Sequence, residues 1–229
     1  MSLNDIAIIG HTGFIGTNMS SAVQADRFSS SNIDIIKERE YDTIYCCAPG
    51  ATKWMINKEP EKDLQNIRNL IQIIEKTSCK RFVLFSTIDV MTFKNAVSYG
   101  GNRLIFEEDL QKIYPDISII RLPGLFGPGL KKNSIFDLQN KRHEYVNLDS
   151  AFQWLYIQRA IDYALTSSPG IHELYTEPVE TLDIVNRFFP ESLEKCDVKI
   201  RNEYKIIPKS GYFQSKEEVM KDLEVYLGL

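Results

Sequence analysis

The sequence predicts an α/β protein built on a doubly wound parallel sheet, and its length leaves room for a small appended lobe. The apolar run 6–9 has the length and composition of a buried strand. A helical pattern follows it, and three glycines stand between the two at three-residue spacing: Gly10, Gly13 and Gly16. A second fully apolar run, 82–87, comes after a long amphipathic helix that begins at Lys62. Alternation of apolar strands with amphipathic helices is typical of a parallel sheet covered by helices.

Each of the three glycines has its own physical role in such a turn. The first permits a tight turn out of the strand, the second lets backbone approach a pyrophosphate, and the third lets the helix pack closely. The helix N-terminus adds unpaired N–H groups and the positive end of the helix dipole. Many strand–helix turns contain glycine for backbone reasons alone. Strand, glycines and helix in this order nevertheless favour a Rossmann-type fold that binds a dinucleotide.

Composition limits the classes of function. The chain has 229 residues, enough for one large α/β domain, and its net charge of −4 argues against a nucleic-acid partner. No apolar run approaches the ~20 residues that span a bilayer. The cysteines lack CxxC spacing and argue against a metal site: Cys46, Cys47, Cys79 and Cys196. At least two of these cysteines lie in apparent buried strands, and a reduced, cytoplasmic protein fits this pattern best.

The end of the second strand bears on the choice between NAD and NADP. An acid there usually holds the ribose 2′-hydroxyl of NAD, and no acid stands there in this chain. Ser29, Ser30 and Ser31 can donate hydrogen bonds to a 2′-phosphate, and Arg27 can supply positive charge. An ordinary polar turn explains the serines equally well. The preference for NADP over NAD is therefore slight.

The other elements are expected at the following positions. Strands are expected within 27–32 (very short) and over 42–48, 82–87 and 117–121. Helices are expected over 33–40 (brief), from Lys62, from Ser98 to about Ile113 and over 181–189. A capping box at 215–218 begins a last helix. Segment 52–58 has no assignable pattern.

Polar side chains at the end of one strand and the start of the next helix are candidates for catalytic residues. Ser86 and Thr87 end an apolar strand, where ligands of open parallel sheets bind, although such residues often merely end strands. Tyr99 and Arg103 are four residues apart and share a helical face. A cation one turn away stabilises phenolate and lowers the pKa of a tyrosine. A packing or cation–π contact is the commoner reason for such a pair.

The chain resembles an extended short-chain dehydrogenase/reductase of the NAD(P)-dependent epimerase/dehydratase family, which acts mainly on nucleotide-sugars. The resemblance covers nearly the whole chain and rests on these segments: GHTGFIG at 10–16, the strand ending at Ala48, LQNI at 64–67, FVLFSTIDV at 82–90, YGGNR at 99–103, RLPGLFGPG at 121–129 and FQWLYI at 152–157. It implies a single NAD(P)-binding domain over 1–229, in which 127–150 and 167–229 contribute a small substrate lobe.

The resemblance also implies roles for individual residues. Thr87 orients the substrate oxygen, Tyr99 is the general acid/base, and Arg103 stands where the family has lysine. The implied cofactor contacts are Gly10, His11, Thr12, Gly13, Phe14, Ile15, Gly16, Ser29, Ser30, Ala48, Tyr99, Arg103 and Pro123. Arg142, in a segment expected to cover the substrate cleft, is a candidate substrate contact. A homodimer is usual in the families that this chain resembles.

Two departures from the family pattern bear on function. Arg103 keeps a positive charge but not the compact ammonium that reaches both ribose hydroxyls. The chain is also short, which leaves little room for a full substrate lobe. We expect an epimerase or reductase of a nucleotide-sugar, and the alternative is a non-catalytic NAD(P)-binding sensor or regulatory module. A dehydratase is disfavoured, because an acid normally adjoins the residue at Thr87, whereas Asp89 stands two positions along.

Overall fold

The chain forms two compact units. The computed structural model describes residues 5–93, 95–196 and 201–229. Unit 1 consists of Met1–Arg121 and Ile161–His172, and unit 2 of Leu122–Ala160 and Glu173–Leu229. Among the described residues, no helix combines the length and hydrophobicity that a bilayer span requires.

Unit 1 is built on a mostly parallel, six-stranded sheet, which confirms the predicted fold class. Its strand order is β2-β1-β3-β4-β5-β8, so the order reverses at β1. The strands are β1 (Ile6–Ile9), β2 (Asp26–Phe28), β3 (Glu40–Cys46), β4 (Ser78–Thr87), β5 (Ser118–Leu122) and β8 (Gly170–Glu173). β1 pairs in parallel with β2 on one side and with β3 on the other. Ligands of such sheets bind at the carboxyl ends of the strands that flank this reversal.

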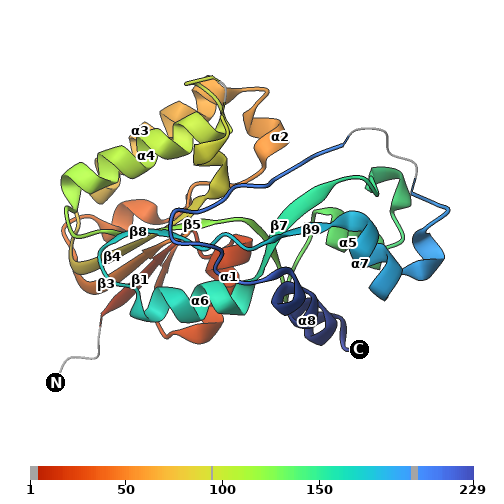
Figure 1. The fold of residues 1–229 in the computed structure, drawn as a ribbon. Coiled ribbons are helices and arrows are strands. Elements are labelled where there is room, and N and C mark those ends of the chain that lie inside the picture. The colour runs from red at the N-terminus through yellow and green to blue at the C-terminus, as the bar shows by residue number, and fades with distance from the viewer. Residues whose placement is uncertain (1–4, 94, 197–200) are drawn as a thin grey trace. The chain divides into compact units, whose positions relative to one another are not determined.

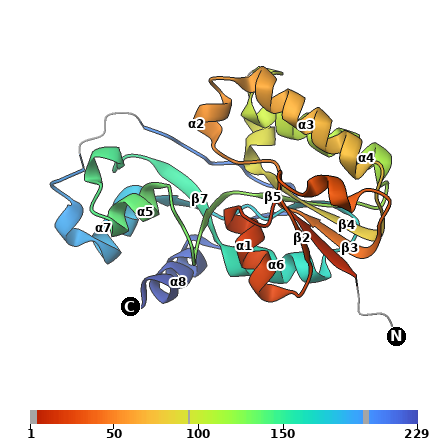
Figure 2. The same ribbon diagram turned by 180° about the vertical axis from the view of Figure 1, so that it is seen from behind.

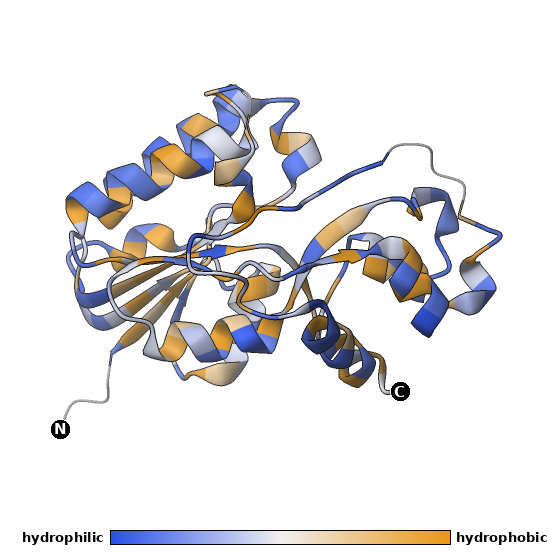
Figure 3. Cartoon of the chain, in the orientation of Figure 1, coloured by the Kyte–Doolittle hydropathy of each residue, from blue (hydrophilic) through white to orange (hydrophobic). Residues whose placement is uncertain are grey.

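Helices cover both faces of this sheet. The helices of unit 1 are α1 (Phe14–Ala22), η1 (Ile33–Ile36), α2 (Lys53–Ile56), α3 (Pro60–Ile74), η2 (Ile88–Met91), α4 (Tyr99–Ile113) and the end of α6 (Ile157–Thr166). α3 and α4 lie together on one face, and α1 lies on the other (Figures 1 and 2). The sheet strands are largely hydrophobic and α3 and α4 alternate in hydropathy (Figure 3). Apolar side chains thus pack between the layers, and Ile44, Ile67 and Phe106 are nearly fully buried there.

Unit 2 has a small sheet and a hydrophobic core of its own. β7 (Ala151–Tyr156) pairs in parallel with β6 (Gly124–Phe126) and antiparallel with β9 (Pro178–Glu180). The helices of unit 2 are α5 (Ser134–Gln139), η3 (His143–Tyr145), α7 (Thr181–Phe188), η4 (Pro190–Ser192) and α8 (Lys216–Leu227). α8 begins at the predicted capping box, in which Ser215 and Glu218 bond each other's backbone N–H groups.

Several predicted boundaries were wrong. A helix was expected over 33–40, but only the short 3₁₀ helix η1 forms, and β3 already starts at Glu40. β4 begins four residues before Phe82, because its first residues pair with the start of β3 on the exposed rim. Segment 52–58, left unassigned, contains the four-residue helix α2. A single turn of helix has no apolar periodicity to detect.

Candidate active site

The glycine turn between β1 and α1 is held by its own backbone. The N–H of Gly10 donates to the carbonyl of Phe28 at 2.8 Å, and the N–H of Gly13 donates to the carbonyl of Gly10 at 3.1 Å. Gly10 has a φ of +82°, and a Cβ there would come within 2.9 Å of the Ala48 nitrogen. A Cβ on Gly16 would lie 2.2 Å from the Gly10 carbonyl oxygen. Both positions therefore require glycine for the fold itself.

Gly13 differs from the other two glycines. A Cβ on it would meet only the Gly10 oxygen, at an ordinary 3.5 Å, and its φ is −77°. Gly13 is exposed and is the N-cap of α1, whose first turn holds no acidic residue. By helix geometry the N–H groups of Phe14, Ile15 and Gly16 have no intrahelical acceptor. The turn thus presents donors and a positive dipole end, as a diphosphate requires.

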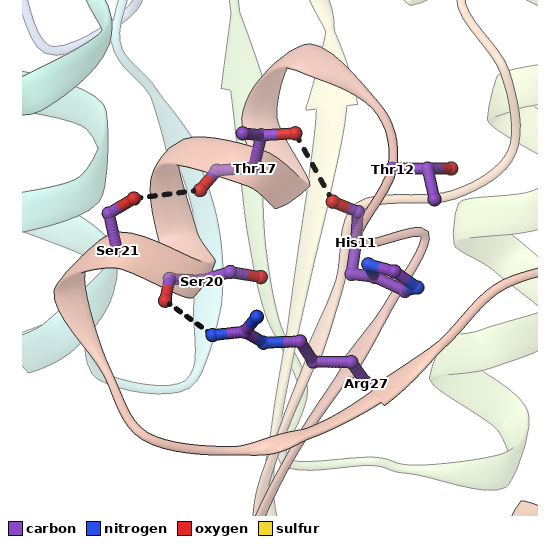
Figure 4. Close-up of a pocket in the computed structure, with 6 residues that line it drawn as sticks. All are labelled: His11, Thr12, Thr17, Ser20, Ser21 and Arg27. Atoms are coloured by element: carbon purple, nitrogen blue, oxygen red, sulfur yellow. Dashed lines mark hydrogen bonds between the residues drawn. The ribbon is translucent and has the colours of Figure 1, made fainter.

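A surface pocket of about 400 Å³ adjoins this turn. Its lining comes from the turn, from α1 and from β2, and consists of His11, Thr12, Thr17, Ser20, Ser21 and Arg27 (Figure 4). The guanidinium of Arg27 donates to the Ser20 carbonyl at 3.1 Å and lies beside the hydroxyl-bearing face of α1. The hydroxyl oxygen of Ser20 is buried, with no hydrogen-bond partner among the described residues. Hydroxyls around an arginine fit a phosphate group.

The serines after β2 form a polar turn. The hydroxyls of Ser29 and Ser31 lie 2.8 Å apart, and the Ser29 N–H donates to Asn32 Oδ1 at 2.7 Å. Ser30 is exposed, and none of the three serines lines the pocket beside the glycine turn. Arg27, which was expected to supply positive charge, does line that pocket.

Thr87 and Tyr99 come together at the carboxyl end of β4. Ser98 caps α4 by accepting from the N–H of Gly101 at 3.2 Å, and Asn57 accepts from the Tyr99 N–H at 2.9 Å. These bonds fix the first turn of α4, where Tyr99 is only 6% exposed. Thr87 lies against Tyr99, and its hydroxyl acts to lower the pKa of the Tyr99 phenol. The structure thus brings together the two residues expected to act on a substrate oxygen.

Arg103 lies one turn below Tyr99 and is committed to a buried ion pair. Its guanidinium carbon is 4.7 Å from the centroid of the Tyr99 ring, a cation–π contact. Both of its terminal nitrogens donate to the carboxylate of Asp63, at 2.9 and 3.2 Å, and one also donates to the Gly50 carbonyl at 2.7 Å. Asn102 donates to the same carboxylate at 2.9 Å. Arg103 therefore supports Tyr99 from the ring face while it ties α4 to α3.

Two charged residues that sequence reasoning did not place in the site lie beside Thr87. The Thr87 hydroxyl is 3.3 Å from Asp89 Oδ2, and the Asp89 N–H donates back to that hydroxyl at 3.2 Å. Lys53, from α2, forms an ion pair with Oδ1 of the same carboxylate. α4 approaches this corner closely, since a Cβ on Gly100 would lie 2.3 Å from the Asp89 carbonyl oxygen. The glycine after Tyr99 was the one sequence signal for this close approach.

Burial controls the acidity of Tyr99. It raises the pKa of the Tyr99 hydroxyl above its ordinary value, and the negative charge of Asp89 acts in the same direction. Arg103, the hydrogen bond from Thr87 and Lys53 oppose that rise in pKa. Arg103 acts to lower the pKa of Tyr99, as expected from the sequence. Burial of the phenol raises that pKa by more, so the net shift is upward.

Ser86 does not take part in this cluster. Its hydroxyl donates to the carboxylate of Glu107, a residue that is 1% exposed. The guanidinium of Arg121 donates to the same carboxylate through hydrogen bonds of 2.6 to 3.2 Å. The Ser86 hydroxyl is therefore engaged with Glu107, eight residues along α4 from Tyr99. Ser86 thus stabilises the packing of α4 on the sheet.

Two predicted site residues belong to unit 2. Pro123 is buried in the bend between β5 and β6, and Arg142 precedes η3. The guanidinium of Arg142 lies over the rings of Phe136 and Tyr145, with Asp137 3.7 Å away. The roles of Pro123 at a cofactor and of Arg142 at a substrate stay predictions.

No protein-family model and no curated protein sequence matches this chain. Solved structures match its fold. UDP-N-acetylglucosamine 4-epimerase from Methanobrevibacter ruminantium is 15% identical over 94% of this chain and 89% of that one, with a TM-score of 0.64. An NAD-dependent NDP-hexosamine 5,6-dehydratase of tunicamycin biosynthesis is 15% identical over 99% and 92%, with a TM-score of 0.69. dTDP-4-dehydrorhamnose reductase from Yersinia enterocolitica is 14% identical over 99% of each chain, with a TM-score of 0.65.

At these identities the likeness establishes the fold. The chain has the Rossmann-like α/β fold of its structural neighbours, which include epimerases, dehydratases and reductases of nucleotide-sugars. These are the activities of the family that the sequence motifs resemble.

Proposed function

We propose that this protein is an NAD(P)-dependent enzyme that epimerises or reduces a nucleotide-sugar. The observation that carries the proposal is that buried Tyr99 lies against Thr87, whose hydroxyl donates to Asp89, which is in turn paired with Lys53. A non-catalytic dinucleotide sensor has no need of such a cluster. The glycine turn and the N-terminus of α1 supply the fit for a diphosphate. The fold shared with nucleotide-sugar enzymes supports the substrate class.

In this mechanism Tyr99 exchanges a proton with a hydroxyl or carbonyl oxygen of the sugar, while Thr87 orients that oxygen. Arg103 and Lys53 lower the free energy of the phenolate relative to the phenol, against the effect of burial. When bound, the nicotinamide supplies hydride transfer. An epimerase returns the cofactor to its starting redox state, whereas a reductase consumes its reduced form. The Asp89 carboxylate lies 3.3 Å from the Thr87 hydroxyl, and an acid beside this residue supports dehydration as a third reaction type.

We propose NADP as the preferred cofactor. The pocket beside the glycine turn presents Arg27 and hydroxyls of α1, and Asp26 of β2 is already held by Arg39 at 3.2 Å. The Ser29 and Ser31 hydroxyls are engaged with each other, so Arg27 carries this assignment. A homodimer and a cytoplasmic location remain predictions, the second supported by four free thiols.

The first test is titration of the purified protein with NADPH, NADP⁺, NADH and NAD⁺, followed by calorimetry. Gly13→Ala is the matched variant, because its Cβ finds ordinary van der Waals space in the chain but occupies the side on which a diphosphate approaches. We expect micromolar binding by the wild type and a loss of about tenfold or more in Gly13→Ala at unchanged thermal stability. Absence of binding for all four forms would refute the dinucleotide assignment.

The second test separates an enzyme from a sensor. Nucleotide-sugars, beginning with UDP-N-acetylglucosamine, UDP-glucose and dTDP-4-dehydrorhamnose, are screened for turnover. In Tyr99→Phe we expect turnover to fall by about 10²-fold or more, the range for loss of a general acid/base, with cofactor binding retained. Equal turnover in Tyr99→Phe contradicts the assigned mechanism.

A further inference from the structure

The cluster around Thr87 contains more than an acid/base pair requires. Four side chains follow one another: Tyr99 neighbours Thr87, the Thr87 hydroxyl donates to Asp89 Oδ2 at 3.3 Å, and Asp89 Oδ1 forms an ion pair with Lys53. The four come from α4, β4, η2 and α2, and all belong to unit 1.

Exposure rises along this series. Tyr99 is 6% exposed, the side chain of Asp89 is 13% exposed, and that of Lys53 is 43% exposed. The buried phenol is therefore connected, through groups that can each accept and donate a proton, to an ammonium in contact with water. After reduction of a carbonyl, the general acid must take a proton back from water before the next cycle, whereas in an epimerisation the proton returns to the sugar within the cycle. Burial of Tyr99 removes the direct route to water that a reductase needs.

We propose that Thr87, Asp89 and Lys53 form a proton pathway between the Tyr99 hydroxyl and solvent. The pathway rests on the proposed function in that it serves the acid/base role of Tyr99. Arg103 does not belong to it, because both of its terminal nitrogens are bonded to Asp63.

The transfer balances in protons and moves no electrons. As Tyr99 becomes phenolate, its proton passes to Thr87 Oγ1 and the proton of Thr87 passes to Asp89 Oδ2. Lys53, bonded to Oδ1 of that carboxylate, releases a proton to water. Two opposite charges on Asp89 and Lys53 are thereby replaced by a neutral acid and a neutral amine, and the net negative charge stays on Tyr99. The same groups return the proton in the opposite direction.

The test measures exchange of the Tyr99 hydroxyl hydrogen with water and needs neither cofactor nor sugar. In protein labelled with ¹³C at tyrosine Cζ, the isotope shift in mixed H₂O and D₂O reports hydroxyl exchange, and Tyr99→Phe assigns the resonance among the eleven tyrosines. We expect Lys53→Met to slow the exchange by about tenfold or more, the effect of ~1.4 kcal/mol on a barrier. Lys53→Arg keeps the positive charge, but its guanidinium does not release a proton, so its exchange should be as slow as in Lys53→Met. Recovery of the rate in Lys53→Arg would assign Lys53 a purely electrostatic role and overturn the pathway.

Lys58→Met is the matched control. Lys58 lies five residues from Lys53 and is exposed, with its ammonium 4.9 Å from the Trp54 ring centroid. Its substitution should leave the exchange rate unchanged. Equal slowing in Lys53→Met and Lys58→Met would show a general effect of charge or of α2 and would overturn the pathway.

Asp89→Asn separates a pathway from a purely electrostatic role. Loss of the carboxylate removes a charge that raises the pKa of Tyr99, so electrostatics alone makes the hydroxyl more acidic and its exchange faster. A broken pathway makes exchange slower, and that is the expected result. Unchanged or faster exchange in Asp89→Asn refutes the proposal. Because dinucleotide binding is measured separately, failure of the proposed function is told apart from failure of the pathway.

Discussion

The ion pair between Arg103 and Asp63 gives a sharp prediction about stability. In Asp63→Ala, a guanidinium that is 5% exposed loses its counter-charge and hydrogen bonds of 2.9 and 3.2 Å, and Asn102 loses a bond of 2.9 Å. Removal of one partner from a buried pair costs about 3–5 kcal/mol. Because Asp63 is itself 10% exposed at its side chain, we expect the lower end, about 3 kcal/mol.

For a chain of this size, ~1 kcal/mol corresponds to a shift in Tm of about 2–4 °C. We therefore expect Asp63→Ala to lower the Tm, followed by circular dichroism, by about 6–12 °C. Lys62→Ala on the same helix is the control, because the Lys62–Glu59 pair is about 70% exposed on both sides at 3.5 Å. Exposed pairs contribute at most ~1 kcal/mol.

A double variant examines the cause. In Asp63→Leu with Arg103→Met, no charge is left buried, so the loss of stability should be smaller than in Asp63→Ala alone. If Asp63→Ala melts within ~1 °C of Lys62→Ala, the pair does not carry the stability assigned to it here.

Three further predictions concern the cofactor, one helix and pH. Arg27→Ala should weaken binding of NADP⁺ by about tenfold or more, because a charged hydrogen bond is worth ~1.5–3 kcal/mol. The affinity for NAD⁺, measured by calorimetry, should not change. Equal losses of affinity for both cofactors would contradict a 2′-phosphate site at Arg27. Ser215→Ala removes the cap of α8 and should lower the free energy of unfolding in urea by about 1 kcal/mol, whereas Ser30→Ala should not. Burial raises the pKa of Cys46 from 9.0 to about 12, so the folded state keeps a proton that the unfolded chain releases above pH 9.0. Stability should therefore fall as pH rises from 9.0 towards 12, less steeply in Cys46→Ala; a urea midpoint that stays constant over this range would be the contrary result.

Local sequence signals predicted the parts of the site that lie close together in the chain. The glycine turn is specified within seven residues, 10–16, because backbone conformation and close approach demand glycine at Gly10 and Gly16. The start of α4 was equally legible, since Ser98 is a good N-cap and places Tyr99 and Arg103 on one face.

Contacts between distant parts of the chain could not be predicted in this way. Asp63 meets Arg103 across 40 residues, and nothing near either residue indicates that α3 and α4 pack with these side chains opposed. Lys53 was missed because α2 is only four residues long and has no buried residue to reveal it. The role of Ser86 could not be predicted either, because its partner Glu107 lies 21 residues along the chain.

The hydrogen bonds within the glycine turn have a consequence for the speed and strength of binding. The turn is fixed by bonds from Gly10 to Phe28 and from Gly13 to Gly10, and by the contact of Gly16 with the Gly10 carbonyl. Its conformational entropy is therefore lost when the chain folds, not when a diphosphate arrives. A preorganised site of this kind converts more of each contact into affinity. Association should accordingly proceed in one step, without a slow phase of loop ordering.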